Sequence, residues 1–203
     1  MSYSDFTLRD IKKQFGISNK FKTLFDTVTP LEVSKDLEEA IKLSKTLPMK
    51  SEKARSELIV MPILIDLMTR NEQFFTIYSG EVLNADKEKG LIGACDFILA
   101  HNTRAYEINT PILIIVEQAK NHDTEIDILQ CATQMVGAKY YNDKAKKNTD
   151  TIYGCVTTVN QWIFLKLQDN QIIIDNKTYY FNQMKKVLGI FQMIIDYYKK
   201  TLK

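Results

Sequence analysis

Apolar positions follow a helical period in some parts of the chain and form short strand-like runs in others. Helical spacing predicts helices over about 52–70, 124–142 and 182–200. Between them lie runs with the apolar and β-branched content of strands, over 74–82, 93–100, 112–117, 151–157, 162–167 and 171–174. Three consecutive strands followed by a crossover helix and more strands predict an α/β domain with a mixed central sheet.

The first fifty residues have a different character. Residues 1–50 hold few strand signals, and two short helical patterns cover 5–15 and 33–47. Pro30 and Pro48 interrupt this region. We therefore expect an N-terminal helical extension, residues 1–50, packed on a main domain formed by residues 51–203.

The helix predicted over 52–70 begins at a plausible N-cap, Ser51. Pro62 lies inside it and is expected to kink or split it. The apolar positions at helical spacing predict one core-facing stripe, made of Ala54, Leu58, Met61, Ile65 and Met68.

Composition narrows the class of protein. The chain is 45% hydrophobic and 26% charged with a formal net charge of +2, so any nucleic-acid contact must come from a local patch. The longest apolar run, 58–65, is far shorter than the ~20 residues that span a bilayer. No basic region followed by an apolar run opens the chain, so we expect a cytoplasmic protein without a membrane partner. Three separated cysteines and two histidines form no zinc or disulfide pattern.

Three charged features do not fit a purely structural interpretation. Glu57 falls within the predicted apolar stripe of its helix, and Asp96 interrupts the apolar run of a predicted strand. Glu117 and Lys120 follow five consecutive apolar residues, the mark of a strand buried on both faces. Carboxylates and a lysine converging at the margin of a sheet suit Mg²⁺ or Mn²⁺ and metal-assisted phosphodiester hydrolysis. Each feature also has a simpler explanation, such as Glu57 paired with Lys53 or Arg55 at the edge of the stripe.

At these residues the chain resembles the PD-(D/E)xK nuclease superfamily, which has the restriction-endonuclease-like fold, and most closely a group of uncharacterised bacterial proteins. The resemblance covers about residues 50–200 and implies an αβββαβ core. It implies that Glu57 is the helix carboxylate, Asp96 the principal metal ligand, and Glu117 with Lys120 the (D/E)xK pair. Gln130 and Gln134 would lie on the following helix and face the site. The matching segments are 51–60, 89–99, 115–121, 130–135 and 151–158.

The spacing of the motif departs from the family pattern. Glu117 and Lys120 are three residues apart, and in a regular strand positions i and i+3 face opposite sides. A β-bulge at Gln118 would realign them, and this is the alternative we favour. Otherwise Gln118 takes the acidic position as a weaker neutral ligand, or the fold is retained without catalysis.

The sequence therefore predicts a metal-dependent nuclease acting on DNA, or less favourably on RNA. Asp96, Glu117 and Glu57 would hold the metal, Lys120 would polarise the attacking water, and Gln130 or Gln134 would orient it. A homodimer would supply the two sites that duplex cleavage needs. The alternatives are an inactive module that binds nucleic acid or protein, and an unrelated α/β domain.

Overall fold

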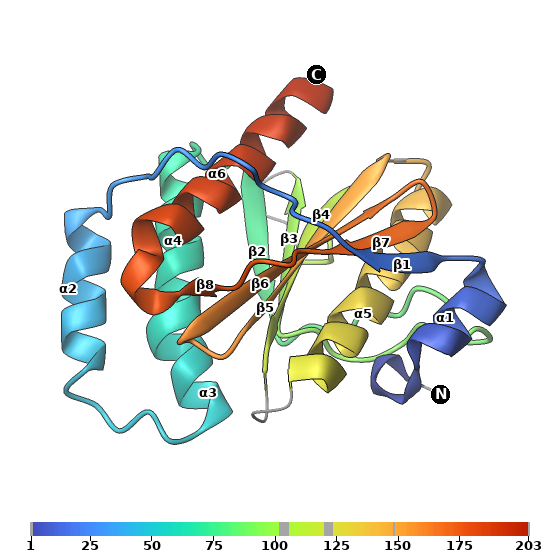
Figure 1. The fold of residues 1–203 in the computed structure, drawn as a ribbon, viewed down its shortest axis with the longest axis horizontal. Helices are drawn as coiled ribbons and strands as arrows, with labels where there is room; N and C mark the ends of the chain where they lie inside the picture. Colours follow the sequence, from blue (N-terminus) through green and yellow to red (C-terminus); the bar gives the residue numbers. More distant parts are fainter. Residues whose placement is uncertain (1, 102–105, 120–123, 148, 203) are drawn as a thin grey trace.

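The computed structural model describes residues 2–101, 106–119, 124–147 and 149–202, in which an eight-stranded mixed sheet lies between two helical layers (Figure 1). The strands are β1 (Ser18–Phe21), β2 (Phe75–Ser79), β3 (Phe97–His101), β4 (Ile112–Gln118), β5 (Thr151–Thr157), β6 (Gln161–Gln168), β7 (Gln171–Ile174) and β8 (Tyr179–Tyr180). The helices are α1 (Leu8–Phe15), α2 (Lys35–Ser44), α3 (Glu52–Arg55), α4 (Met61–Arg70), α5 (Thr124–Lys144) and α6 (Met184–Thr201). Shorter helical turns are η1 (Tyr3–Asp5), η2 (Ser56–Val60) and η3 (Phe181–Gln183).

The strand order confirms an α/β domain with a mixed sheet. It runs β1-β7-β6-β5-β4-β3-β2, with β8 paired to β6. β4 and β5 are parallel and are joined through α5, whereas β2, β3 and β4 are consecutive antiparallel neighbours. From α3 to β5 the chain therefore has the order that the sequence predicts: a helix, three strands, a helix and a strand.

The N-terminal region is not purely helical. β1 pairs in parallel with β7 and forms one edge of the sheet, which the sequence analysis did not predict. The strand has the sequence SNKF and three of its four residues are exposed, so it lacks the apolar alternation that identifies a strand. Residues 1–50 also supply side chains to both cores, including Tyr3 and Ile11 on one face of the sheet and Leu37 on the other.

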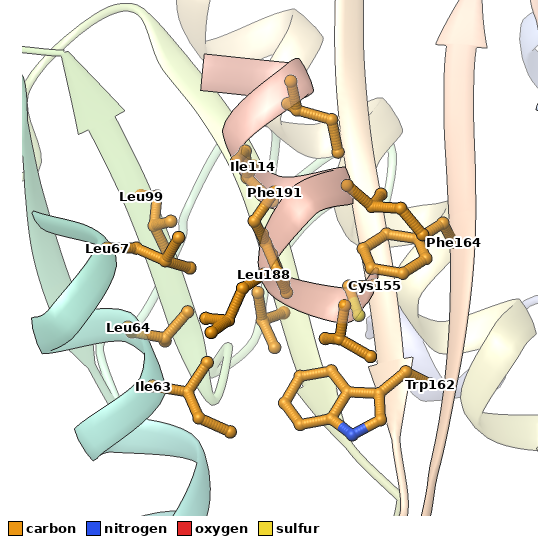
Figure 2. Packing of buried hydrophobic residues seen from close by; sticks show 14 of the residues in the cluster. Ile63, Leu64, Leu67, Leu99, Ile114, Cys155, Trp162, Phe164, Leu188 and Phe191 are labelled. Atoms are coloured by element: carbon orange, nitrogen blue, oxygen red, sulfur yellow. The ribbon is translucent and has the colours of Figure 1, made fainter. Parts of the chain in front are cut away.

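Two apolar cores lie on opposite faces of the sheet. The core beneath α4 and α6 joins Ile63, Leu67, Phe164 and Phe191 to strand residues such as Ile114, and Figure 2 shows their side chains meeting between helix and sheet. The opposite core packs α5 and the N-terminal elements against the sheet. Because both faces are covered, β4 is buried along its whole length, as its continuous apolar run predicts.

The helix predicted over 52–70 contains a π-helical turn, η2, that lies just before Pro62. Proline lacks an N–H group and its ring clashes with the carbonyl four residues earlier, and a π turn is one way to accommodate it. The predicted core stripe is wrong, because the buried side of the helix is formed by Ile59, Val60, Ile63, Leu64 and Leu67. Residues 58–65 are apolar without interruption, so periodicity alone could not tell which side faces the core.

Among the described residues, no helix combines the length and the apolar character needed to cross a membrane.

Candidate metal site at the end of the sheet

Asp96 lies at the point where β3 begins, next to the end of β4. Its backbone carbonyl accepts a hydrogen bond from the Gly80 amide at 2.9 Å, which ties it to the end of β2. Its carboxylate oxygen Oδ2 accepts a hydrogen bond from the Gln118 amide at 2.7 Å. The side chain of Asp96 thus takes the place of a backbone partner at the end of β4, which fixes this carboxylate between two neighbouring strands.

Glu57 and Asp96 line one hollow of about 460 Å³ at this end of the sheet. Helical residues form one wall, and the end of β2 and the start of β3 form the other. Glu57 is exposed rather than inside the apolar stripe, and its carboxylate lies 3.8 Å from Lys53 Nζ. This is the pairing that the simpler explanation expects, yet it leaves Glu57 facing the same space as Asp96. The remaining lining residues are Ser51, Glu52, Lys53, Ser56, Ser79, Gly80 and Phe97.

Glu117 faces α5 and is only 1% exposed. Its Oε1 accepts a hydrogen bond from Gln130 Nε2, and its Oε2 accepts one from Gln134 Nε2 at 3.0 Å. The structure thus brings together Glu117 and the two glutamines that the sequence singles out. Gln130 and Gln134 are themselves buried, one turn apart on α5.

The register of β4 contradicts the predicted bulge at Gln118. Glu117 pairs with Val156 and Gln118 with Thr157 in unbroken sequence, and the Ala119 amide continues the ladder to the Thr157 carbonyl at 2.8 Å. The register between β3 and β4 does shift, but at Leu99/Ala100, near the start of β4. There the Asn142 side chain bonds both the amide and the carbonyl of Ile112 and replaces strand partners.

Regular alternation therefore turns Glu117 and Gln118 to opposite faces. Glu117 contacts α5, whereas Gln118 shares its side with Val116, which belongs to the core beneath α4. The Gln118 side chain is fully buried, and its Oε1 has no hydrogen-bond partner in the part of the chain that the structure describes. Lys120, the fourth residue of the predicted site, lies outside the described residues.

Sequence reasoning did not identify Asp127, which is 3% exposed in the first turn of α5. Asp127, Gln130 and Gln134 follow one another at i, i+3 and i+7, so they form a polar stripe on a helix that is buried on most sides. That spacing could have identified Asp127 from the sequence. Polar residues that share one stripe of a buried helix need polar partners, so they indicate a polar site.

Burial and the nearby carboxylates raise the pKa values of two neighbouring cysteines, Cys95 and Cys131. Burial raises the pKa of Cys131 well above its usual range, and the nearby carboxylates of Glu117, Asp96 and Asp127 raise it further. Burial followed by the charge of Glu117 raises the pKa of Cys95 in the same direction. The thiols are therefore neutral at physiological pH.

The donors at the hollow are oxygens, which is the chemistry that Mg²⁺ and Mn²⁺ prefer. Within the described residues, no three His, Cys, Asp or Glu side chains lie close enough together to hold a metal ion. Mg²⁺ is commonly held by one or two carboxylates and completed by water and substrate phosphate, so Asp96 and Glu57 fit such an ion in kind and in number.

No protein-family model, curated protein or solved structure matches this chain. The functional argument therefore depends on the arrangement of the chain's own residues.

Proposed function

We propose that this chain is a divalent-metal-dependent, nuclease-type phosphodiester hydrolase with a restriction-endonuclease-like core. The observation that carries the proposal is the position of Asp96. It connects the start of β3 to the end of β4 through the Gln118 amide and lines a hollow with the helix carboxylate Glu57. A helix carboxylate and a strand carboxylate that line one hollow form an arrangement suited to binding a cation and a phosphate together.

In this proposal Asp96 and Glu57 hold a Mg²⁺ or Mn²⁺ ion. The bound ion would polarise the phosphodiester and lower the pKa of an attacking water. The serine hydroxyls of the hollow, Ser51, Ser56 and Ser79, can donate hydrogen bonds to phosphate oxygens. Lys53, which lies beside Glu57, adds a positive charge for the same group.

Glu117 has a supporting role in the proposal. Its two bonds to Gln130 and Gln134 hold a negative charge on the α5 side of β4, and Glu117 and Asp96 both act on the thiol of Cys131. This charge raises the affinity of the neighbouring hollow for a cation. Lys120 is proposed to stabilise the negative charge that develops on the phosphate.

The proposed substrate is DNA, with RNA as the less favoured alternative, and the proposed location is the cytoplasm. One observation favours a second candidate, an inactive module of the same fold that binds nucleic acid or a protein partner. The side chain of β4 that shares a face with the core beneath α4 is the neutral Gln118, not Glu117. The neutral side chain of Gln118 would bind a cation more weakly than a carboxylate would.

A plasmid-nicking assay tests the first candidate. Wild-type protein with Mg²⁺ or Mn²⁺ should convert supercoiled DNA to the open form, and chelation should stop the reaction. Asp96→Asn should lower the rate by at least about 100-fold, because it removes the charge while keeping an acceptor for the Gln118 amide. The matched control is Glu39→Gln, which neutralises an exposed carboxylate on α2 and should leave the rate unchanged.

Nicking that Asp96→Asn does not slow would contradict the proposal. Nucleic-acid binding without metal-dependent cleavage of DNA or RNA would instead support the inactive module.

A further inference from the structure

Helix α4 is apolar on two sides. Its core side carries Ile63, Leu64 and Leu67, which are completely buried. Its other side carries Met61, Ile65 and Met68 at i, i+4 and i+7, and Ile65 is 46% exposed. Met61 and Met68 are partly buried against the core beneath α4, so the exposed residue between them, Ile65, is the one that requires a separate explanation.

The second stripe, formed by Met61, Ile65 and Met68, borders a groove along one edge of the sheet. We call this the edge groove; it measures about 390 Å³ and lies between α4 and β2. The two elements lie side by side at that end of the sheet (Figure 1). Its lining contains no charged side chain and consists of Met61, Ile65, Met68, Gln73, Phe75, Thr76 and Ile77.

β2 is an edge strand whose own sequence lacks the usual protection. It ends the strand order, and of the strands that the structure describes it pairs only with β3. Natural edge strands are commonly protected against a further strand by charged residues, proline or a bulge. The sequence of β2, FTIYS, has no charge and no proline, and its register with β3 is regular from Phe75 to Ser79.

We propose that the edge groove binds a second copy of this chain. The two β2 strands pair antiparallel about a twofold axis that is perpendicular to the sheet, and the two α4 helices pack their second stripes together on one face. Ile77 is the middle residue of β2 and Ile65 lies in the middle of the stripe, and both line the edge groove. A single twofold axis near these two isoleucines therefore pairs β2 with β2 of the second copy and packs α4 against α4 of the second copy.

Charge favours a second copy as the occupant. A twofold axis places like side chains near one another, so a charged edge would repel itself, whereas the edge groove is uncharged. An extended peptide could pair with β2 but would offer no helix to cover the exposed Ile65. A second copy supplies both a strand and an apolar helix in one geometry. This inference goes beyond the proposed hydrolase activity and does not depend on it.

Sedimentation velocity of the full chain over a concentration series tests the proposal. The wild-type protein should sediment as a dimer at concentrations of about 10–100 µM. Ile65→Glu and, separately, Ile77→Lys should weaken dimerisation by at least about tenfold, because each buries a charge near its symmetry copy. The control is Leu43→Glu, which changes a 65% exposed leucine on α2 and should leave the mass unchanged.

Circular dichroism must show native melting for Ile65→Glu, and the 46% exposure of Ile65 makes this expected. A wild-type monomer throughout the concentration range would overturn the proposal. So would a dimer that neither substitution weakens, or a monomer that gains mass only when an extended peptide is added.

Discussion

At the scale of single residues, Glu117 is the most unusual side chain. A carboxylate that is 1% exposed must be hydrogen-bonded, since an isolated buried charge costs several kcal/mol. The amides of Gln130 and Gln134 supply donors to both of its oxygens. The two glutamines therefore stabilise the fold as well as positioning the charge on the α5 side of β4.

We expect Gln134→Leu to lower the free energy of unfolding by about 1–3 kcal/mol, because it keeps the side-chain volume but removes a donor from a buried carboxylate. Urea unfolding measures this change. Lys13→Leu, which alters an exposed side chain on α1, should change the stability by less than about 0.5 kcal/mol. Equal effects of the two substitutions would mean that the Glu117 contact contributes nothing.

The three buried thiols predict a loss of stability in alkaline solution. Burial raises the pKa values of Cys95, Cys131 and Cys155 in the folded protein, whereas the unfolded chain ionises near pH 8.5. The unfolded state therefore releases protons first, and stability is lost as pH rises. Above about pH 9, each thiol should lower the free energy of unfolding by about 1.4 kcal/mol per pH unit.

Urea unfolding between pH 7.5 and about 9.5 checks this pH dependence. Cys155→Ala should reduce the slope by about one third, whatever its effect on stability at neutral pH. A slope that the substitution leaves unchanged would assign the pH dependence to other groups.

The strand pattern singled out Asp96, whereas Gln130 and Gln134 were expected near it only because of the resemblance to PD-(D/E)xK nucleases. The sequence could not decide which face Glu117 takes, since this depends on the register of β4. The register shift lies at the start of β4 and not at Gln118. At the start of β4, the side chain of Asn142 bonds the backbone of Ile112 and sets the local geometry.

At the scale of elements, α6 is held by the segment that joins β1 to α2. The Leu31 amide donates to the Lys185 carbonyl at 2.8 Å, and Lys185 Nζ lies 2.6 Å from Glu32. A side chain at Gly189 would collide with the backbone carbonyl of Thr29. The close approach of these two segments therefore requires glycine at this position.

Gly189→Ala should destabilise the protein by about 1–3 kcal/mol, because the obstacle is backbone and cannot rotate away. The change in thermal midpoint measures the effect. Lys186→Ala, an exposed substitution on the same helix, is expected to shift the midpoint little. An unchanged midpoint for Gly189→Ala would mean that the segment around Thr29 is free to move away from α6.

Most elements were predictable because buried strands and amphipathic helices have strong periods. β4, β5 and β7 begin where the pattern places them, and α5 covers the predicted range. β1 could not be found in this way, since its residues are mostly exposed and its place depends on pairing with β7. The buried side of α4 could not be predicted from periodicity, because residues 58–65 are apolar without interruption and α4 is apolar on two sides.

At the scale of the whole molecule, residues 1–50 belong to the cores on both faces of the sheet. Tyr3 is buried against α5, and its hydroxyl donates to the carbonyls of Leu83 and Leu91. Phe25 and Leu37 enter the core beneath α4 and α6. We therefore expect residues 1–50, predicted as an extension packed on the main domain, to contribute to the stability of both cores.

A chain lacking residues 1–50 should show no cooperative thermal transition by circular dichroism, because both cores lose large buried side chains. Adding a peptide of residues 1–50 should restore a transition. A truncated chain that melts cooperatively near the wild-type midpoint would establish residues 51–203 as an independent domain.

The central claim is that the hollow shared by Asp96 and Glu57 binds a divalent cation. Calorimetric titration of the full chain with Mn²⁺ tests this claim most directly, with Asp96→Asn and Glu39→Gln compared under the same conditions. The account predicts saturable binding by the wild type and by Glu39→Gln, and at least about tenfold weaker binding by Asp96→Asn. Heats of dilution alone for the wild type, or equal affinity in all three proteins, would contradict it.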